Sequence, residues 1–235
     1  MTLQVVRTLP AGTYRRARKG DYSILESYLG ALRSAERLVY LENQFLWSPE
    51  VVNVLVEKLA APPTEDFRIV VLLPARANDG ADISRGQVAA LIDADAGNDR
   101  FLACTVYARE GPLRDIVYVH AKVGIVDDRW LTVGSANLNA HSLLHDTEMN
   151  VAVHDRDLAR ATRLRLWSEH LERDEKDVGG DPAQVVDGLW WPIATEQLHR
   201  IERGEPLTHR LVRLPGVSRR RRRVFGSLES HLYDV

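Results

Sequence analysis

The first 155 residues alternate short apolar or β-branched runs with segments whose apolar residues recur at helical spacing. This alternation constrains the fold more than any other feature of the chain, because it places helices across a mostly parallel sheet. The runs expected as strands are residues 3–8, 37–41, 67–73, 101–107, 117–126, 130–133 and 149–154. The sequence therefore predicts an α/β fold.

Helical segments are expected between these strands. Apolar residues recur at helical spacing over residues 23–34, and Ser48 with Pro49 opens a helix through residue 59, since serine caps a helix and proline suits its first position. A polar loop at 75–86 leads to a helix near 87–95. After Asp155 the strand pattern stops, and a charged helix over 158–171 precedes a second helical region.

The size and charge of the chain limit its function. A chain of 235 residues can bury a core in one or two domains. The net charge of -2 argues against indiscriminate binding of nucleic acid or anionic lipid, so an anion site must be local. The apolar runs are too short to span a membrane and no signal peptide is present, so a cytoplasmic or peripheral membrane location is the default expectation.

Two further features concern Cys104 and the C-terminus. Cys104 is the sole cysteine and lies in an apolar run, which predicts an inert core thiol. Arg219 to Arg223 belong to a basic tail expected over residues 211–235. Such a run is usually a solvated tail, and its functional alternative is attraction to anionic lipid or nucleic acid.

The segment 119–139 carries two linked motifs: H-x-K-x4-D at His120, Lys122 and Asp127, then G-S-x-N at Gly134, Ser135 and Asn137. The first motif is expected by chance on the order of 0.01 times in a chain of this composition, so it is a strong signal. In a strand, alternate residues share a face, which places the imidazole of His120 beside the ammonium of Lys122. A turn at 127–129 then returns the chain toward that strand.

These residue types suit a phosphate site. Lys122 offers N–H donors to phosphoryl oxygens, and Ser135 and Asn137 add neutral donors. An imidazole can attack phosphorus or protonate a leaving alkoxide near neutral pH. Glu148, which follows His120 by twenty-eight residues, is the candidate carboxylate for fixing the tautomer of its ring.

The pair of motifs resembles the signature of the phospholipase D superfamily, H-x-K-x4-D followed by G-S-x-N. Residues 39–46 (V-Y-L-E-N-Q-F-L) look like the I-Y-I-E-N-Q-F-F strand that precedes the second motif of two-motif phospholipases D, and residues 145–153 are similar to the stretch after it. The resemblance implies an α/β/α sandwich with a mixed, mostly parallel sheet, formed here by a half-domain over residues 1–210 with its motif region at 114–141.

The resemblance also implies a set of site residues and a reaction. His120 is the expected catalytic histidine, Lys122 and Asn137 bind phosphate, Ser135 supports them, and Glu148 is the partner of His120. The motif aspartate, Asp127, is also in the catalytic motif, although in the family its role is mostly structural. Three further residues are candidates for a wall of the site, with a structural role as an equal alternative: Glu42, Asn43 and Gln44. The family reaction passes through a phosphohistidine with no metal or cofactor, and the expected substrate is a phospholipid at a membrane surface, with nucleic acid disfavoured.

The family uses two copies of the motif, one histidine as nucleophile and the other as general acid, and this chain has one copy. A lone copy lacks a factor of roughly 10² to 10⁴ that general acid catalysis supplies. The favoured origin is the C-terminal half of a two-motif enzyme, because residues 42–44 match that half and the chain opens in an expected strand with no leader. A homodimer acting as a nuclease or a cardiolipin-synthase-like transferase is one alternative, and an inactive interaction module is the other.

Two rival chemistries are weaker. His141, His145 and Glu148 suggest a metal site only if they share a helix, whereas the segment is expected to be a polar loop leading to a strand. Ser135 lies in G-S-A-N and not in G-x-S-x-G, so a serine hydrolase is rejected. We therefore expect no metal.

Overall fold

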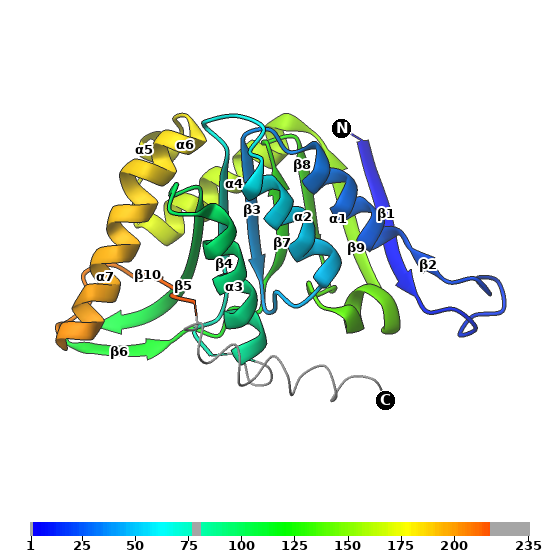
Figure 1. The fold of residues 1–235 in the computed structure, drawn as a ribbon, viewed down its shortest axis with the longest axis horizontal. Helices are drawn as coiled ribbons and strands as arrows, with labels where there is room; N and C mark the ends of the chain where they lie inside the picture. The colour runs from blue at the N-terminus through cyan, green and yellow to red at the C-terminus, as the bar shows by residue number, and fades with distance from the viewer. Residues whose placement is uncertain (1, 77–80, 217–235) are drawn as a thin grey trace.

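The computed structural model of the chain describes residues 2–76 and 81–216, and these form one sheet with helices on both faces (Figure 1). The ten-stranded sheet has the order β10-β5-β4-β3-β7-β8-β9-β1-β2, with β6 paired to β5. Its strands are β1 (Thr2–Leu9), β2 (Asp21–Tyr22), β3 (Leu38–Asn43), β4 (Arg68–Leu72), β5 (Phe101–Glu110), β6 (Leu113–Ile116), β7 (Lys122–Val126), β8 (Trp130–Gly134), β9 (Glu148–His154) and β10 (Leu211–Arg213).

The sheet is mixed, and its parallel part is less extensive than expected. Among the named strands, only β3–β4 and β4–β5 pair in parallel, while the remaining pairings are antiparallel. The cause is a hairpin between β7 and β8, where Asp127 and Asp128 have φ angles of 52° and 50°. Hairpin turns of this kind enforce antiparallel neighbours. The predicted α/β class with a helix-flanked mixed sheet is confirmed.

Three helices cover the near face of the sheet in Figure 1: α1 (Ser23–Ser34), α2 (Pro49–Ala60) and α3 (Ala81–Asp95). Ile24 of α1, Leu55 of α2 and Val71 of β4 belong to the same fully buried apolar cluster. The expected cap of α2 is present, because Ser48 Oγ accepts a hydrogen bond from the backbone N–H of Val51 at 3.3 Å.

The other face carries α4 (Arg156–Leu171), α5 (Glu175–Val178), α6 (Pro182–Val185), the π-helical turn η2 (Val186–Trp190) and α7 (Trp191–Arg203). Tyr40, Trp167 and Trp190 pack edge to face there, with ring centroids 5.5 to 5.9 Å apart. Cys104 is buried in this second core, and burial raises the pKa of its thiol, in keeping with an inert residue. Two cores separated by one sheet make an α/β/α sandwich.

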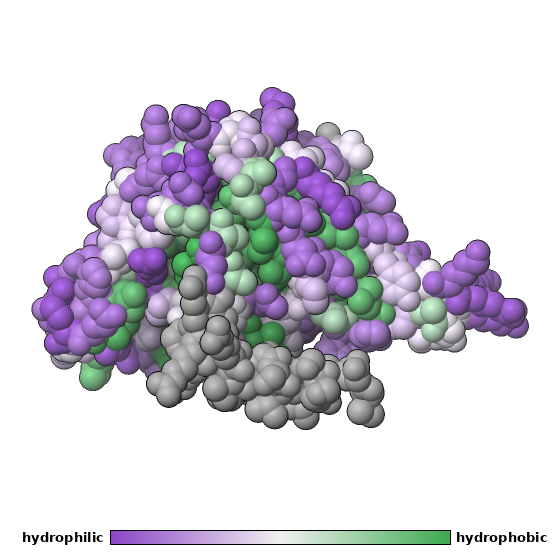
Figure 2. Space-filling model, in the orientation of Figure 1, coloured by the Kyte–Doolittle hydropathy of each residue, from purple (hydrophilic) through white to green (hydrophobic). Residues whose placement is uncertain are grey.

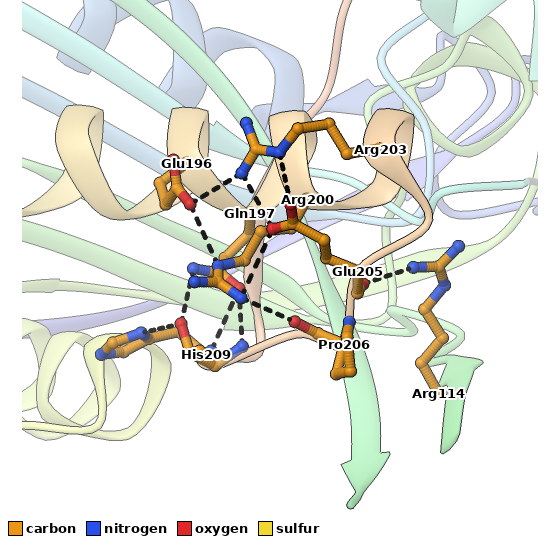
Figure 3. Close-up of polar contacts among 9 residues, drawn as sticks. Arg114, Glu196, Gln197, Arg200, Arg203, Glu205, Pro206 and His209 are labelled. Carbon is orange, nitrogen blue, oxygen red and sulfur yellow. Dashed lines mark hydrogen bonds and ion pairs between the residues drawn. The ribbon is translucent and has the colours of Figure 1, made fainter. Parts of the chain in front are cut away.

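Polar contacts fix the chain between α7 and β10 (Figure 3). Arg203 pairs with Glu205 at 2.8 Å, and the Gln197 side-chain oxygen accepts the backbone N–H of Thr208 at 2.8 Å. Since β10 then pairs with β5, the sheet continues past the expected domain boundary at residue 210. The arginine run 219–223 lies outside the described residues.

Two segments differ from the expected elements. The strand expected over 117–126 begins only at Lys122, because β6 lies beside β5 whereas β7 lies beside β3, and residues 117–121 connect them outside any strand. A π-helical turn, η1 (His141–His145), stands where a polar loop was expected. Among the described residues, no helix is both long enough and apolar enough to traverse a bilayer.

Candidate active site

Four strand ends bring the motif residues to one edge of the sheet, the lower edge in Figure 1, where β3 ends. Asn43 at the end of β3 pairs with Lys122 at the start of β7, and Gly134 at the end of β8 pairs with Asn150 near the start of β9. His120 lies just before β7, and Ser135 just after β8. The antiparallel hairpin thus places the two halves of the signature side by side, as predicted.

Lys122 is the buried cation of this edge, with 8% of its surface exposed. Its Nζ donates hydrogen bonds to Gln44 Oε1 at 3.1 Å and to the His120 carbonyl at 3.4 Å. Burial lowers the pKa of Lys122 from its usual 10.5, while the charge of Glu148 acts in the opposite direction. A desolvated ammonium is attracted more strongly to an anion than a hydrated one.

The ring of His120 is exposed and stacks with Tyr118, with centroids 6.2 Å apart and planes 22° apart. The Tyr118 hydroxyl accepts a hydrogen bond from Gln44 Nε2, and Gln44 Oε1 binds Lys122. Gln44 therefore contacts Lys122 directly and His120 indirectly, through the Tyr118 ring that stacks with His120. The sequence placed Gln44 in the site wall but gave Tyr118 no role, since its one signal is the same-face spacing two residues before His120.

Glu148 opens β9 beside Ser135, whose Oγ donates to the Glu148 carboxylate and accepts the backbone N–H of Met149 at 3.1 Å. Among the described residues, no hydrogen bond joins Glu148 to His120. The edge brings both residues together, and the pairing of this carboxylate with the imidazole stays a prediction. Ser135 donates its hydroxyl hydrogen to Glu148. Lys122 and Asn137 form no hydrogen bond to that carboxylate among the described residues.

Gly134 is required by a close approach. A Cβ atom at this position would lie 2.1 Å from Asn150 Oδ1 and 2.4 Å from the Met149 carbonyl oxygen. Asn150 is fully buried; its Oδ1 accepts the backbone N–H of Ala136 at 3.2 Å and so fixes the start of the G-S-x-N loop. The sequence missed this role of Asn150, which has no motif position of its own.

The rest of that loop is held against the segment after β3. Asn43 Oδ1 accepts the backbone N–H of Leu138 at 3.1 Å, and Leu46 and Leu138 form a parallel bridge. Asn137 Oδ1 is buried with no hydrogen-bond partner among the described residues. Asn43 thus supports the loop instead of lining the site, while the Asn137 amide oxygen keeps an unused capacity to accept a hydrogen bond.

Glu42, expected in the site wall, points to the opposite face. Its Oε1 lies 3.1 Å from His170 Nε2 of α4 and accepts the Tyr40 hydroxyl at 2.6 Å. Side chains alternate along a strand, so Glu42 and Asn43 face different cores. The wall role of Glu42 is therefore wrong, and among residues 42–44 the side chain that contacts the Lys122 ammonium is that of Gln44.

Asp127 lies at the far end of β7, about 16 Å of strand from Lys122. Its carboxylate accepts the backbone N–H groups of Glu36, Arg37 and Leu38, each at 2.8 Å. It therefore ties the hairpin turn to the start of β3 and takes no part in the site. Its place among the implied catalytic and site residues is wrong, and the mostly structural role that the resemblance implied fits its contacts.

The remaining candidates contribute no further chemistry at this edge. The rings of His141 and His145 lie 6.2 Å apart on η1, and within residues 2–76 and 81–216 no three His, Cys, Asp or Glu side chains are grouped to hold a metal ion. A groove of about 560 Å³ between α1 and the sheet opens at the opposite edge, where Asp127 and His154 line it.

The geometry of the edge suits attack on a phosphodiester. An exposed imidazole and a buried ammonium lie at the same edge beside a carboxylate, and the G-S-x-N loop brings the Asn137 amide to that edge, so a phosphoryl group held by Lys122 would lie next to the ring of His120. Among the described residues, no hydrogen bond or ring contact joins His120 to another imidazole.

Comparison with known proteins agrees with the fold and the motif. The family described as "Cardiolipin synthase, PLD-like domain" matches residues 28–168. Phospholipase D2 of Bos taurus is 28% identical over 200 residues, which cover 67% of this chain and 21% of that protein. Phospholipase D zeta 2 of Arabidopsis thaliana is 26% identical over 226 residues, 72% of this chain and 22% of that protein. The chain thus spans about a fifth of the length of these curated relatives.

Two solved structures share the fold. Nuc from Salmonella typhimurium, a phospholipase D family member, has a TM-score of 0.52 and 18% identity, covering 73% of this chain and 95% of Nuc. NucT from Helicobacter pylori also has a TM-score of 0.52, with 14% identity and coverage of 73% and 97%.

Proposed function

The chain belongs to the phospholipase D superfamily, and from that membership we propose that it is a phosphodiesterase domain that hydrolyses glycerophospholipids through a phosphohistidine on His120. The observation that carries the proposal is the convergence of His120, Lys122 and Asn137 at one sheet edge. The active form pairs this domain with a second domain that carries the same motif.

The proposed reaction has two balanced steps. A ring nitrogen of His120 attacks phosphorus, a P–N bond forms, and the P–O bond to the headgroup alcohol breaks as the second histidine gives the leaving oxygen a proton. Water then attacks phosphorus, the second histidine takes its proton, and the P–N bond breaks to restore His120. The products are phosphatidic acid and the free alcohol, and an alcohol in place of water gives transphosphatidylation.

Lys122 supplies the charge that this reaction requires. The negative charge on the non-bridging oxygens grows as phosphorus becomes five-coordinate, and an ammonium with 8% exposure interacts with it at a low effective dielectric. Gln44 holds Nζ on one side, and the charge of Glu148 opposes the lowering of the Lys122 pKa by burial. The lysine therefore binds the transition state more tightly than the substrate.

An apolar patch that extends to this edge on the sheet face opposite Lys122 supports a protein partner for the second motif. Leu3, Val5, Val133 and Met149 are between 48% and 59% exposed and lie on one face of β1, β8 and β9. Met149 follows Glu148 directly, so a domain seated on this patch would reach the catalytic edge. An interface built this way would bring in the missing general acid.

A lipid substrate is supported by the E-N-Q-F resemblance and by the names of the curated relatives, phospholipases D of animals and plants. A second candidate is a homodimeric nuclease or a cardiolipin-synthase-like transferase. The structural match favours it in one respect, because a domain of this kind makes up 95% of Nuc.

The test is release of the headgroup from phosphatidylcholine and phosphatidylethanolamine vesicles, with sedimentation of the same sample. Active protein should sediment as a two-domain assembly, and His120→Asn should abolish turnover while His199→Asn, an exposed histidine on α7, leaves it unchanged. A strictly monomeric chain with full activity would refute the two-domain requirement. Cleavage of oligonucleotides with no release from lipid would replace the lipid proposal with the second candidate.

A further inference from the structure

The loop that follows β1 stands beside the candidate site. β1 ends at the catalytic edge, because Thr8 pairs with Glu148, and residues 10–20 then leave the sheet before β2. The Tyr14 hydroxyl lies 3.3 Å from Oγ1 of Thr147, the residue before Glu148. We call residues 10–20 the basic loop. It extends from the body of the molecule at the lower right of Figure 1 and forms a hydrophilic projection in Figure 2.

The basic loop carries a local excess of positive charge. Arg15, Arg16, Arg18 and Lys19 are exposed, and residues 10–20 contain no acidic side chain. Across the described part of the chain, none of these four side chains forms an ion pair or a hydrogen bond. A protein with a net charge of -2 therefore concentrates four unneutralised cations within five residues, next to the edge that holds Lys122.

Several exposed arginines elsewhere in the described chain are neutralised by carboxylates. Arg37 pairs with Asp181, and Arg109 lies 2.7 Å from Glu172. At the end of α7, the arginines and glutamates form a closed network of ion pairs (Figure 3). The basic loop differs from these sites because its charges remain available to a partner.

The loop is ordered by its own backbone. Gly12 N–H donates to the Arg18 carbonyl at 3.1 Å, and Ala17 N–H donates to the Tyr14 carbonyl at 3.0 Å. Gly20, with a φ of 79°, closes the loop where a Cβ atom would lie 2.8 Å from the Leu9 carbonyl oxygen. A preformed loop loses little conformational entropy when it binds.

We propose that the basic loop binds the phosphate groups of anionic phospholipids and so holds the catalytic edge at the bilayer surface. This inference rests on the proposed function, because it names the surface on which that site works. The charges sit at the tip of a projection, a shape that meets a flat surface, whereas single-stranded nucleic acid is usually tracked along a groove. Tyr14, 42% exposed, adds an amphipathic ring of the kind that settles at headgroup level.

The experiment measures binding to vesicles with His120→Asn as the parent, so that binding is read without hydrolysis. The loop variant replaces Arg15, Arg16, Arg18 and Lys19 by serine. The matched control removes the same charge from exposed residues of other surfaces: Arg33, Arg156, Arg165 and Arg173, each replaced by serine. The vesicles are equimolar phosphatidylcholine and phosphatidylglycerol, compared with phosphatidylcholine alone.

Each basic side chain near an anionic bilayer contributes about fivefold to binding, so the loop variant should bind the mixed vesicles several-hundred-fold more weakly at low salt, while the control binds like the parent. Equal binding by the loop variant and the parent would overturn the inference, as would equal binding of the parent to both vesicle types. Tighter binding to a single-stranded oligonucleotide than to vesicles of equal phosphate content would reassign the partner, and displacement by inorganic phosphate would reduce the loop to a site for free phosphate. Vesicle binding without any lipid hydrolysis by the unmutated site would leave this inference standing and refute the proposed function alone.

Discussion

Lys122 combines two opposing influences on one ammonium group. Burial lowers its pKa, and the charge of Glu148 acts to raise it. The folded state therefore binds fewer protons than the unfolded chain between the lowered pKa and 10.5, and in that window the contribution of Lys122 to stability rises with pH. The affinity for phosphate has the opposite pH dependence, because it requires the Lys122 ammonium and is lost as pH rises through the lowered pKa.

The first prediction concerns Glu148→Gln. This change removes the charge that opposes burial, so the pKa of Lys122 falls further and affinity for inorganic phosphate should be lost at a lower pH than in the parent. Titration of phosphate binding against pH measures the shift, with Glu65→Gln, an exposed residue, as the control. If the loss of phosphate affinity at high pH occurs at the same pH or at a higher pH in Glu148→Gln, then Glu148 does not raise the pKa of Lys122.

The second prediction concerns Gly134. Gly134→Ala puts a methyl group 2.1 Å from Asn150 Oδ1, so the free energy of unfolding should fall by roughly 1–3 kcal/mol. Gly30→Ala is the matched control, because a Cβ there meets nothing within 4 Å, and alanine in a helix should add about 0.5–1 kcal/mol. Urea unfolding measures the free energy of unfolding of both variants. If Gly134→Ala is no less stable than Gly30→Ala, the close approach at Gly134 is contradicted.

The sequence predicted which polar residues lie at the candidate site but not the contacts between them. His120, Lys122, Ser135, Asn137 and Glu148 follow from spacing, since strand periodicity and one hairpin suffice to bring them to an edge. The link from Gln44 to Tyr118 joins residues 74 positions apart and depends on which loop crosses the sheet edge. No local pattern encodes that crossing.

At the scale of elements, a salt bridge joins α4 to the β7–β8 hairpin. Arg163 Nε and Nη2 contact the two carboxylate oxygens of Asp128 at 2.7 and 2.8 Å, and Arg163 is 1% exposed. Its guanidinium also lies 4.5 Å from the ring centre of Trp167. The aspartate after the motif aspartate therefore anchors the helix that covers the second core.

The third prediction tests that anchor. Arg163→Met leaves the Asp128 carboxylate without its partner and should lower the free energy of unfolding by about 3 kcal/mol. Arg165→Met, at an exposed position on the same helix, should change it by no more than about 0.5 kcal/mol. If urea unfolding gives the same change for both variants, the anchor does not stabilise the fold.

Elements with strong periodicity were predictable, and short or edge elements were not. The segment 23–34 and the capped α2 carry their signals locally. β6 and β10 consist of four and three residues, so their pairing with β5 depends on the completed sheet. The same dependence explains why the parallel pairing is narrower than the alternation of strands and helices suggested.

At the scale of the whole molecule, the sequence contains one copy of the motif, whereas the proposed reaction uses two histidines. The described residues include the proposed nucleophile and the proposed phosphate ligand, and an apolar patch extends to the same edge of the sheet. General acid catalysis is the missing contribution, and it matters only when the leaving group must be protonated. A substrate whose leaving group departs as a stable anion therefore separates the role of His120 from that of the absent partner.

The most direct measurement is a rapid-mixing assay of the purified chain with bis(p-nitrophenyl) phosphate, which releases p-nitrophenolate without a proton donor. We predict a burst of nitrophenolate equivalent to the protein present, a phosphoryl adduct on His120 in the mass spectrum, and loss of both in His120→Asn with His199→Asn unaffected. A chain that gives no burst with this substrate, or one that keeps its burst after His120→Asn, would contradict the assignment of His120 as the nucleophile.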